Sequence, residues 1–207
     1  MDMFSRKDLV RLFAPLLVEQ LLAVLVGMAD VVMVAAVGET AVSGVALVDS
    51  ISVLIIQVLS AMATGGAVVC SQYIGKKKPE QACRAAGQLV LITAALSLLI
   101  AAVAFIGNRH LLRLIFGSVE ASVMDNAQTY FWFTAMSYPF LALYNSGAAL
   151  FRSMGNSKVS MKVSLAMNAI NVAGNALCVF GLHMGVEGVA IPTLVSRMFA
   201  AVVMVIL

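Results

Sequence analysis

The chain has 207 residues, of which 62% are hydrophobic and 11% charged, and its mean hydropathy is +1.01. A water-soluble domain carries about a quarter charged residues, so this composition excludes an ordinary soluble fold and leaves no room for a soluble catalytic domain. The net charge of +3 is too small and too scattered to indicate nucleic-acid binding. We therefore expect an integral membrane protein.

Six apolar runs follow one another along the chain, separated by short polar breaks. Their lengths suit helices of about 20 apolar residues that cross a bilayer, and they lack the alternating polarity of barrel strands. The sequence predicts an all-α, polytopic membrane protein that forms one transmembrane unit over residues 1–207. The spans are expected near residues 12–37, 44–72, 85–107, 128–151, 163–182 and 188–207. Turns are expected at Gly38 to Thr40, Gly75 to Pro79, Gly107-Asn108, Gly155 to Ser157 and Gly181 to Gly188.

The distribution of Lys and Arg predicts the orientation, because basic residues concentrate on the cytoplasmic side. One side would hold only Arg109 and Arg113. The other would hold ten: Arg6, Lys7, Arg11, Lys76, Lys77, Lys78, Arg84, Arg152, Lys158 and Lys162. We expect a multi-pass protein of the cell (inner or plasma) membrane with a cytoplasmic N-terminus. The sixth run ends at Leu207 without a polar tail, so we also expect a fragment cut after its sixth span.

Polar side chains inside the spans give the main indication of function, because a charge at the bilayer centre costs about 2.5–3.5 kcal/mol. Glu19 and Asp30 are 11 residues apart, almost three helical turns, so they project from one face of the first span. Asp49 lies in the second span. The fifth span carries a polar stripe at spacings of 4, 3, 4 and 3: Ser164, Asn168, Asn171, Asn175 and Cys178.

These groups are expected at a common depth. At 1.5 Å per residue, Asp30, Asp49 and Asn175 lie about 8–11 Å below the outer boundary. A carboxylate beside another in low dielectric can take and release a proton near neutral pH, and neighbouring amide oxygens suit Na⁺. Interhelical hydrogen bonds, worth about 0.6–2 kcal/mol each, explain the same amides without any ion. The residues alone leave both interpretations open.

Two further polar residues have more than one interpretation. Gln57 lines a cavity or joins helices. Arg197, about nine residues into the sixth span, pairs with an acid, extends toward the interface or contacts substrate.

The remaining chemistry-bearing residues give no sign of catalysis. His110 and His183 are expected in outer loops, and Cys70, Cys83 and Cys178 are far apart without metal-ligand spacing. The sequence has no HExxH, no GxSxG and no glycine-rich phosphate loop. We expect neither an enzyme nor a cofactor or metal site.

Short motifs along the whole chain resemble the multidrug and toxic compound extrusion (MATE) family. They are Pro15, Glu19-Gln20, Met28-Ala29-Asp30, Gly65, Ser71-Gln72-Tyr73-Ile74-Gly75, Tyr130, Pro139, Arg152 to Lys158, Asn168, Asn171 and Gly188 to Thr193. The resemblance implies the N-terminal lobe of a twelve-helix antiporter, with the C-terminal lobe as the missing partner. Such antiporters export organic, often cationic, compounds by alternating access in exchange for Na⁺ or H⁺.

The resemblance also implies roles for particular residues. Asp30 would bind the coupling ion, supported by Asn171 and Asn175. Several prokaryotic members carry Asp where this chain has Asn175, so their two-acid proton scheme does not transfer.

The leading hypothesis is a cation-coupled multidrug efflux antiporter. Its partners would be small organic substrates, the lipid bilayer and the second lobe, with Na⁺ or H⁺ as the transported ion. Candidate cavity or substrate residues are Glu19, Asp49, Gln57, Asn168 and Arg197. The alternatives are a lipid-linked precursor flippase of the same superfamily, whose cavity should be richer in Arg and Lys, and a non-transporting six-helix membrane assembly module.

Overall fold

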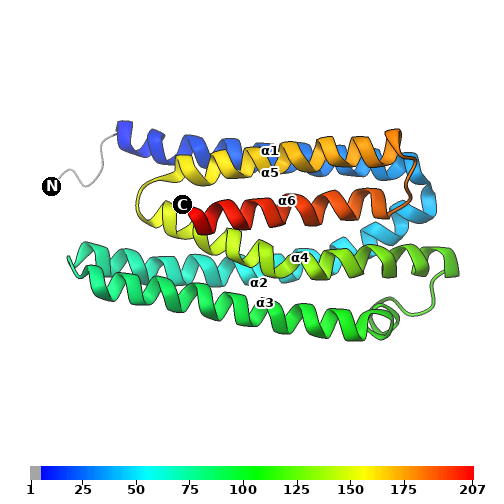
Figure 1. The fold of residues 1–207 in the computed structure, drawn as a ribbon, viewed down its shortest axis with the longest axis horizontal. Coiled ribbons are helices and arrows are strands. Elements are labelled where there is room, and N and C mark those ends of the chain that lie inside the picture. The colour runs from blue at the N-terminus through cyan, green and yellow to red at the C-terminus, as the bar shows by residue number, and fades with distance from the viewer. Residues whose placement is uncertain (1–5) are drawn as a thin grey trace.

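The protein is a bundle of antiparallel helices in the computed structural model, which describes residues 6–207, with side chains from Phe13 onward and that of Val10. No strand occurs among these residues, so the all-α prediction is confirmed. The helices lie side by side along the long axis of the molecule (Figure 1). Their bounds are α1 Arg6–Val37, α2 Glu39–Gly75, α3 Pro79–Phe116, α4 Ala121–Ser153, α5 Ser157–Ala176 and α6 Glu187–Ile206, with a π-helix, η1, at Leu177–Gly181 that continues α5.

Tight connections make the helices antiparallel. Gly38 alone separates α1 from α2, with φ 144°, a backbone conformation that favours glycine. Pro79 opens α3, where its missing N–H costs no helical hydrogen bond. Gly155, with φ 79°, turns the chain between α4 and α5.

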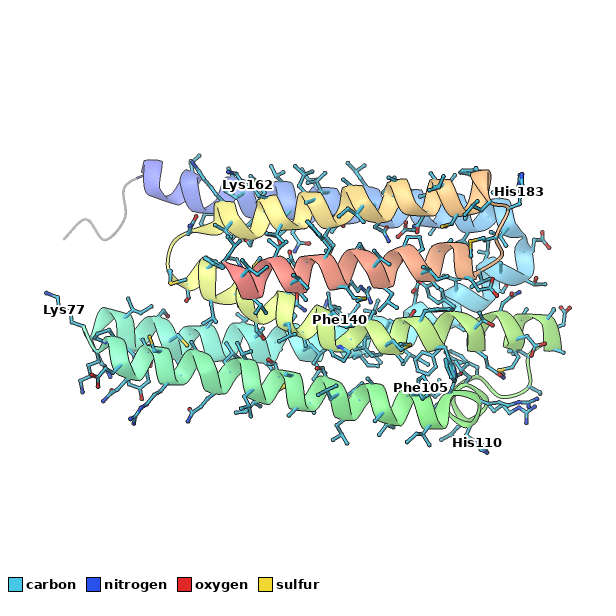
Figure 2. All side chains as sticks on the ribbon, in the orientation of Figure 1. Lys77, Phe105, His110, Phe140, Lys162 and His183 are labelled. Atoms are coloured by element: carbon cyan, nitrogen blue, oxygen red, sulfur yellow. The ribbon has the colours of Figure 1, made fainter. Side chains whose placement is uncertain are left out.

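One predicted turn is wrong. Gly107 and Asn108 lie inside α3, which continues to Phe116. The Asn108 side chain is buried and its Nδ2 donates a hydrogen bond to the Gln128 carbonyl of α4 at 3.0 Å. The amide nitrogen therefore has its partner between helices and does not require a loop, whereas the buried Oδ1 has no hydrogen-bond partner among the described residues. His110, expected in an outer loop, is consequently an exposed residue of α3, whereas His183 lies in the loop after η1 (Figure 2).

The fourth helix is the most enclosed of the bundle. Within the part of the chain that the structure describes, five helices are long and apolar enough to cross a membrane: α1, α2, α3, α5 with η1, and α6. The 33-residue α4 is the exception, although a span was expected at residues 128–151. It packs against α2 and α3 on one side and against α5 and α6 on the other. Because α4 faces protein around most of its circumference, it accommodates polar residues that lipid would exclude.

The two ends of the bundle differ in charge as the sequence predicts. Lys77 and Lys162 lie at the end where α1 begins, and His110 and His183 lie at the opposite end (Figure 2). The side chains of Arg6, Lys7 and Arg11 lie outside the described residues. Which membrane surface each end faces stays a prediction.

Replacing Gly44 by Ala should destabilise the bundle. A Cβ at this position of α2 would lie 2.9 Å from the Ala127 nitrogen and 3.0 Å from the Val123 oxygen, both backbone atoms of α4. Overpacking of this kind costs about 1–3 kcal/mol, so the melting temperature of the purified protein in detergent should fall. Gly65→Ala is the matched control, because nothing lies within 4 Å of its added Cβ. Equal melting temperatures for the two variants would contradict the close α2–α4 contact.

Candidate functional site

A cavity of about 440 Å³ opens between α1, α2, α4, α5 and α6. Much of its wall is aliphatic, including Val26 and Val34 of α1 and Val42, Val45 and Ile56 of α2. The polar residues that line it come from all five helices: Asp30, Asp49, Tyr130, Asn168, Asn171, Thr193, Ser196 and Arg197. An apolar pocket with a few convergent polar groups is the usual form of a small-molecule site.

Asp30 is the carboxylate at one end of a hydrogen-bonded series that joins three helices. Its Oδ1 accepts a hydrogen bond of 2.7 Å from Asn175 Nδ2 on α5, and the same nitrogen lies 3.4 Å from Asn171 Oδ1. Asn171 Nδ2 donates to Thr193 Oγ1 on α6 at 2.9 Å. The Thr193 hydroxyl donates to the Val189 carbonyl one turn earlier, at 2.8 Å. The polar stripe of α5 thus connects Asp30 to α6.

One oxygen of this series has no hydrogen-bond partner. Asn175 is fully buried, and its Oδ1 is unsatisfied among the described residues. A buried amide oxygen without a donor is destabilising by about 1–3 kcal/mol. This oxygen belongs to the amide whose nitrogen binds Asp30, and amide and carboxylate oxygens are ligands of the kind that Na⁺ takes.

A cation and a second acid face the same cavity. Arg197 of α6 donates from Nη1 to Ser137 Oγ of α4 at 2.6 Å, and Ser137 is fully buried. Asp49 of α2 lines the cavity together with the buried Tyr130 of α4. Within the described residues, no carboxylate oxygen lies within 4.0 Å of the Arg197 guanidinium. The cavity therefore presents two acids and one base that are not directly paired.

Glu19 belongs to a different cluster, nearer the beginning of α1. Its Oε1 accepts a hydrogen bond from the Tyr144 hydroxyl at 3.0 Å and lies 3.6 Å from Arg152 Nη1. Its Oε2 lies 3.4 Å from Ser160 Oγ. Glu19 shares a helix face with Asp30, but it is not among the residues that line the cavity.

The other sequence candidates divide in the same way. Asp49, Asn168, Asn171 and Arg197 line the cavity with Asp30. Gln57 is exposed on α2 and lies outside the lining.

Four polar contributors among the described residues were not singled out as site residues from the sequence alone: Tyr130, Ser137, Thr193 and Ser196. Thr193 carried a usable signal, because it precedes Arg197 by one helical turn and so shares its face. Ser137 carried none, since an isolated serine in a transmembrane helix has many roles.

The comparison with protein families decides the identity of the fold. The MatE family model matches residues 15–177, which is most of the chain. The chain belongs to the MatE family. The match begins at Pro15, includes Asp30 and ends just after Asn175, so it contains the hydrogen-bonded series from α1 to α5.

Two curated MatE relatives are similar over nearly the whole chain. The uncharacterized transporter YisQ of Bacillus subtilis (strain 168) is 30% identical over 197 residues, covering 93% of this chain. The probable multidrug resistance protein NorM of Thermotoga maritima is 26% identical over 203 residues, covering 95%. The chain spans 43% of the length of each relative.

Solved transporter structures share the MatE fold of this chain. A MOP superfamily transporter from Pyrococcus furiosus with a binding pocket of reverse polarity matches with TM-score 0.89 and 20% identity, covering 96% of this chain and 43% of its own. An outward-facing multidrug resistance MATE family transporter also matches with TM-score 0.89 and 20% identity, covering 96% of this chain and 44% of its own.

Replacing Glu19 by Ala should loosen α1 from the bundle. The change leaves the buried Tyr144 hydroxyl without its acceptor and Arg152 without its acidic partner. The expected loss is about 1–3 kcal/mol, measured as a lower melting temperature and as faster amide exchange in α1. Glu80→Ala, in the exposed first turn of α3, is the control. Unchanged exchange in α1 would show that the cluster does not hold this helix.

Proposed function

We propose that this chain is the N-terminal lobe of a cation-coupled antiporter that exports organic, often cationic, compounds across the cell membrane by alternating access. Asp30 binds the coupling ion, Na⁺ or H⁺, and Asn171 and Asn175 support it. The cavity beside Asp30 receives the substrate, and a second lobe completes the transporter. No enzymatic step and no resident cofactor belong to this mechanism. Membership of the MatE family and the name of the Thermotoga relative, a probable multidrug resistance protein, favour this function.

The observation that carries the proposal is the arrangement of oxygens around Asp30. Its carboxylate is half-buried at a cavity wall and accepts a hydrogen bond from Asn175, whose own Oδ1 has no donor. A cation at this position would neutralise the carboxylate and satisfy the amide oxygen at once. A proton on Asp30 would achieve only the first of these.

Charge neutralisation at Asp30 can act on the position of α1. The hydrogen bond from Asn175 to Asp30 joins α1 to α5, and its strength depends on the charge of the acceptor. Binding or release of the ion therefore changes how firmly α1 is held against α5. A ligand shifts a conformational equilibrium only through such a difference in interaction between the two states.

The alternative of a non-transporting assembly module predicts no ion dependence. In that case Asp30, Asn171 and Asn175 serve only as interhelical contacts. A lipid-linked precursor flippase would need several basic groups for a pyrophosphate, whereas Arg197 is the one basic residue that lines the described cavity.

Ion binding should stabilise the purified protein, and Asp30→Asn should abolish that effect. A ligand that binds the folded state alone raises its stability by RT ln(1 + [L]/Kd), about 2.7 kcal/mol at one hundred times Kd. We expect the melting temperature to rise with Na⁺ or to depend on pH, and to lose this dependence in the variant. Asp125→Asn, exposed on α4 and outside this cavity, is the control. A melting temperature of the wild type that ignores both Na⁺ and pH would favour the assembly module.

Transport should depend on the same carboxylate. When an inward Na⁺ or H⁺ gradient is imposed, cells expressing the gene should extrude an acridine dye in exchange for the ion. Extrusion is measured by recovery of dye fluorescence outside the cell. Asp30→Asn should lower the extrusion rate about tenfold or more, because the variant lacks the carboxylate that binds the coupling ion. A tenfold change in rate corresponds to about 1.4 kcal/mol. Asp125→Asn should extrude at the wild-type rate. Equal rates for wild type and Asp30→Asn would remove Asp30 from the mechanism.

A further inference from the structure

The Arg197 guanidinium is held by a neutral partner, which leaves its charge available. Its Nη1 donates to Ser137 Oγ at 2.6 Å, and the Ser137 hydroxyl in turn donates to the Thr134 carbonyl at 2.7 Å. The serine thus accepts from the arginine and is satisfied on both sides. Arginine has five N–H donors, and this is the one hydrogen bond from Arg197 among the described residues. Arg197 also lines the cavity, so a ligand bound there could accept from its other donors.

A charged arginine inside a membrane-spanning helix is energetically unfavourable unless an anion or water contacts it. Within the described residues, the nearest carboxylates form no ion pair with Arg197 inside 4.0 Å. Its anchoring by a buried serine fixes the guanidinium at one place instead of letting it follow an acid. Such a fixed, unpaired guanidinium is suited to a carboxylate or phosphate oxygen of a ligand.

One acid of the cavity, Asp49, lies as far into its helix as Arg197 lies into α6. Asp49 and Arg197 each follow the first residue of their helix, Glu39 and Glu187, by ten positions, or about 15 Å. The two helices run in the same direction (Figure 1). Asp30, Asp49 and Arg197 line the same cavity, so its walls carry two carboxylates and one guanidinium.

We propose that Arg197 binds the anionic group of a zwitterionic substrate, whose cationic group lies toward Asp30 and Asp49. This inference rests on the proposed export function and assigns a specificity-determining residue to it. A ligand with several negative charges and no cation would be repelled by the two acids. A purely cationic ligand would gain nothing from Arg197. The charge pattern therefore favours a small zwitterion: a largely apolar skeleton with one cationic and one anionic group.

The competing role for Arg197 is that of an internal counter-charge to Asp49. Under that role the residue would tune binding of every cation and would not distinguish a ligand with a carboxylate from one without it. The two roles are separated by a pair of ligands that differ in the carboxylate alone.

Rhodamine 110 and rhodamine 123 form such a pair, because the second is the methyl ester of the first. Binding of each dye to the purified chain in nanodiscs is measured by fluorescence anisotropy. Arg197→Gln should weaken binding of the free acid about tenfold or more and change binding of the ester less than about twofold. Arg197→Lys, which keeps the charge but loses the planar donors, should fall between wild type and Arg197→Gln for the acid. Arg109→Gln, an exposed arginine of α3 outside this cavity, should match wild type for both dyes.

The outcomes distinguish this inference from the function on which it rests. Equal weakening of both dyes, or of neither, in Arg197→Gln overturns the inference and leaves export of cations intact. Binding of inorganic pyrophosphate to the wild type more tightly than rhodamine 110 also overturns it, in favour of a phosphate ligand. Failure of the wild type to bind either dye contradicts the proposed function and the inference together.

Thermal melting of Arg197→Gln checks that this variant folds. If the variant shows no unfolding transition, Ser137→Ala is tested in its place. That variant releases the guanidinium from its anchor and should weaken binding of the acid more than of the ester.

Discussion

Two carboxylates attach α1 to the rest of the bundle, and the site depends on this mode of attachment. Glu19 is bound to α4 and α5 through Tyr144, Arg152 and Ser160, and Asp30 is bound to α5 through Asn175. Between them the apolar side chains of α1 are mostly exposed: Leu21, Val24, Leu25 and Met28 have exposed fractions of 60–64%. In lipid these side chains gain little by packing on protein, so the polar contacts decide where the helix lies.

This attachment relates ion binding to the shape of the cavity. Of the two carboxylates, only Asp30 lines the cavity, whereas Glu19 is engaged by a tyrosine, a serine and an arginine. The Glu19 contact thus keeps one part of α1 in place while the Asp30 contact responds to charge. Asn171 and Thr193 extend the response to α6, where Arg197 lies one turn beyond Thr193. The proposed ion site and the proposed substrate cavity therefore share the same series of hydrogen bonds.

Much of the fold could be predicted from the sequence because hydropathy alone determines where helices cross a membrane. The six helices, the segregation of lysines to one end and the polar stripe of α5 all follow from spacing and composition. The predicted turn at Gly107-Asn108 failed because the Asn108 side-chain nitrogen donates to the α4 backbone, a partner that lies 20 residues away. The low apolarity of α4 likewise reflects its surroundings, which the local sequence does not contain.

The site was predictable only in part, for a related reason. Periodicity placed Asp30 and the α5 amides on definite helix faces, but it could not say which faces meet. Glu19 and Asp30 share a face and were grouped together, yet their partners come from different places along α4 and α5. The anchoring of Arg197 by Ser137 joins residues 60 positions apart and becomes visible only when helices are packed.

Glycine residues let several helices of the bundle approach one another closely. Gly44 brings α2 against the backbone of α4, and Gly174 brings α5 against Pro192 of α6, where an added Cβ would lie 2.7 Å from the proline ring. Neither contact can slide without a steric clash, and Gly147 of α4 makes a third against Met204 of α6. Asp49 of α2 and Arg197 of α6 line the same cavity beside these contacts. Any shift of α6 relative to α2 would therefore change the separation of two opposite charges.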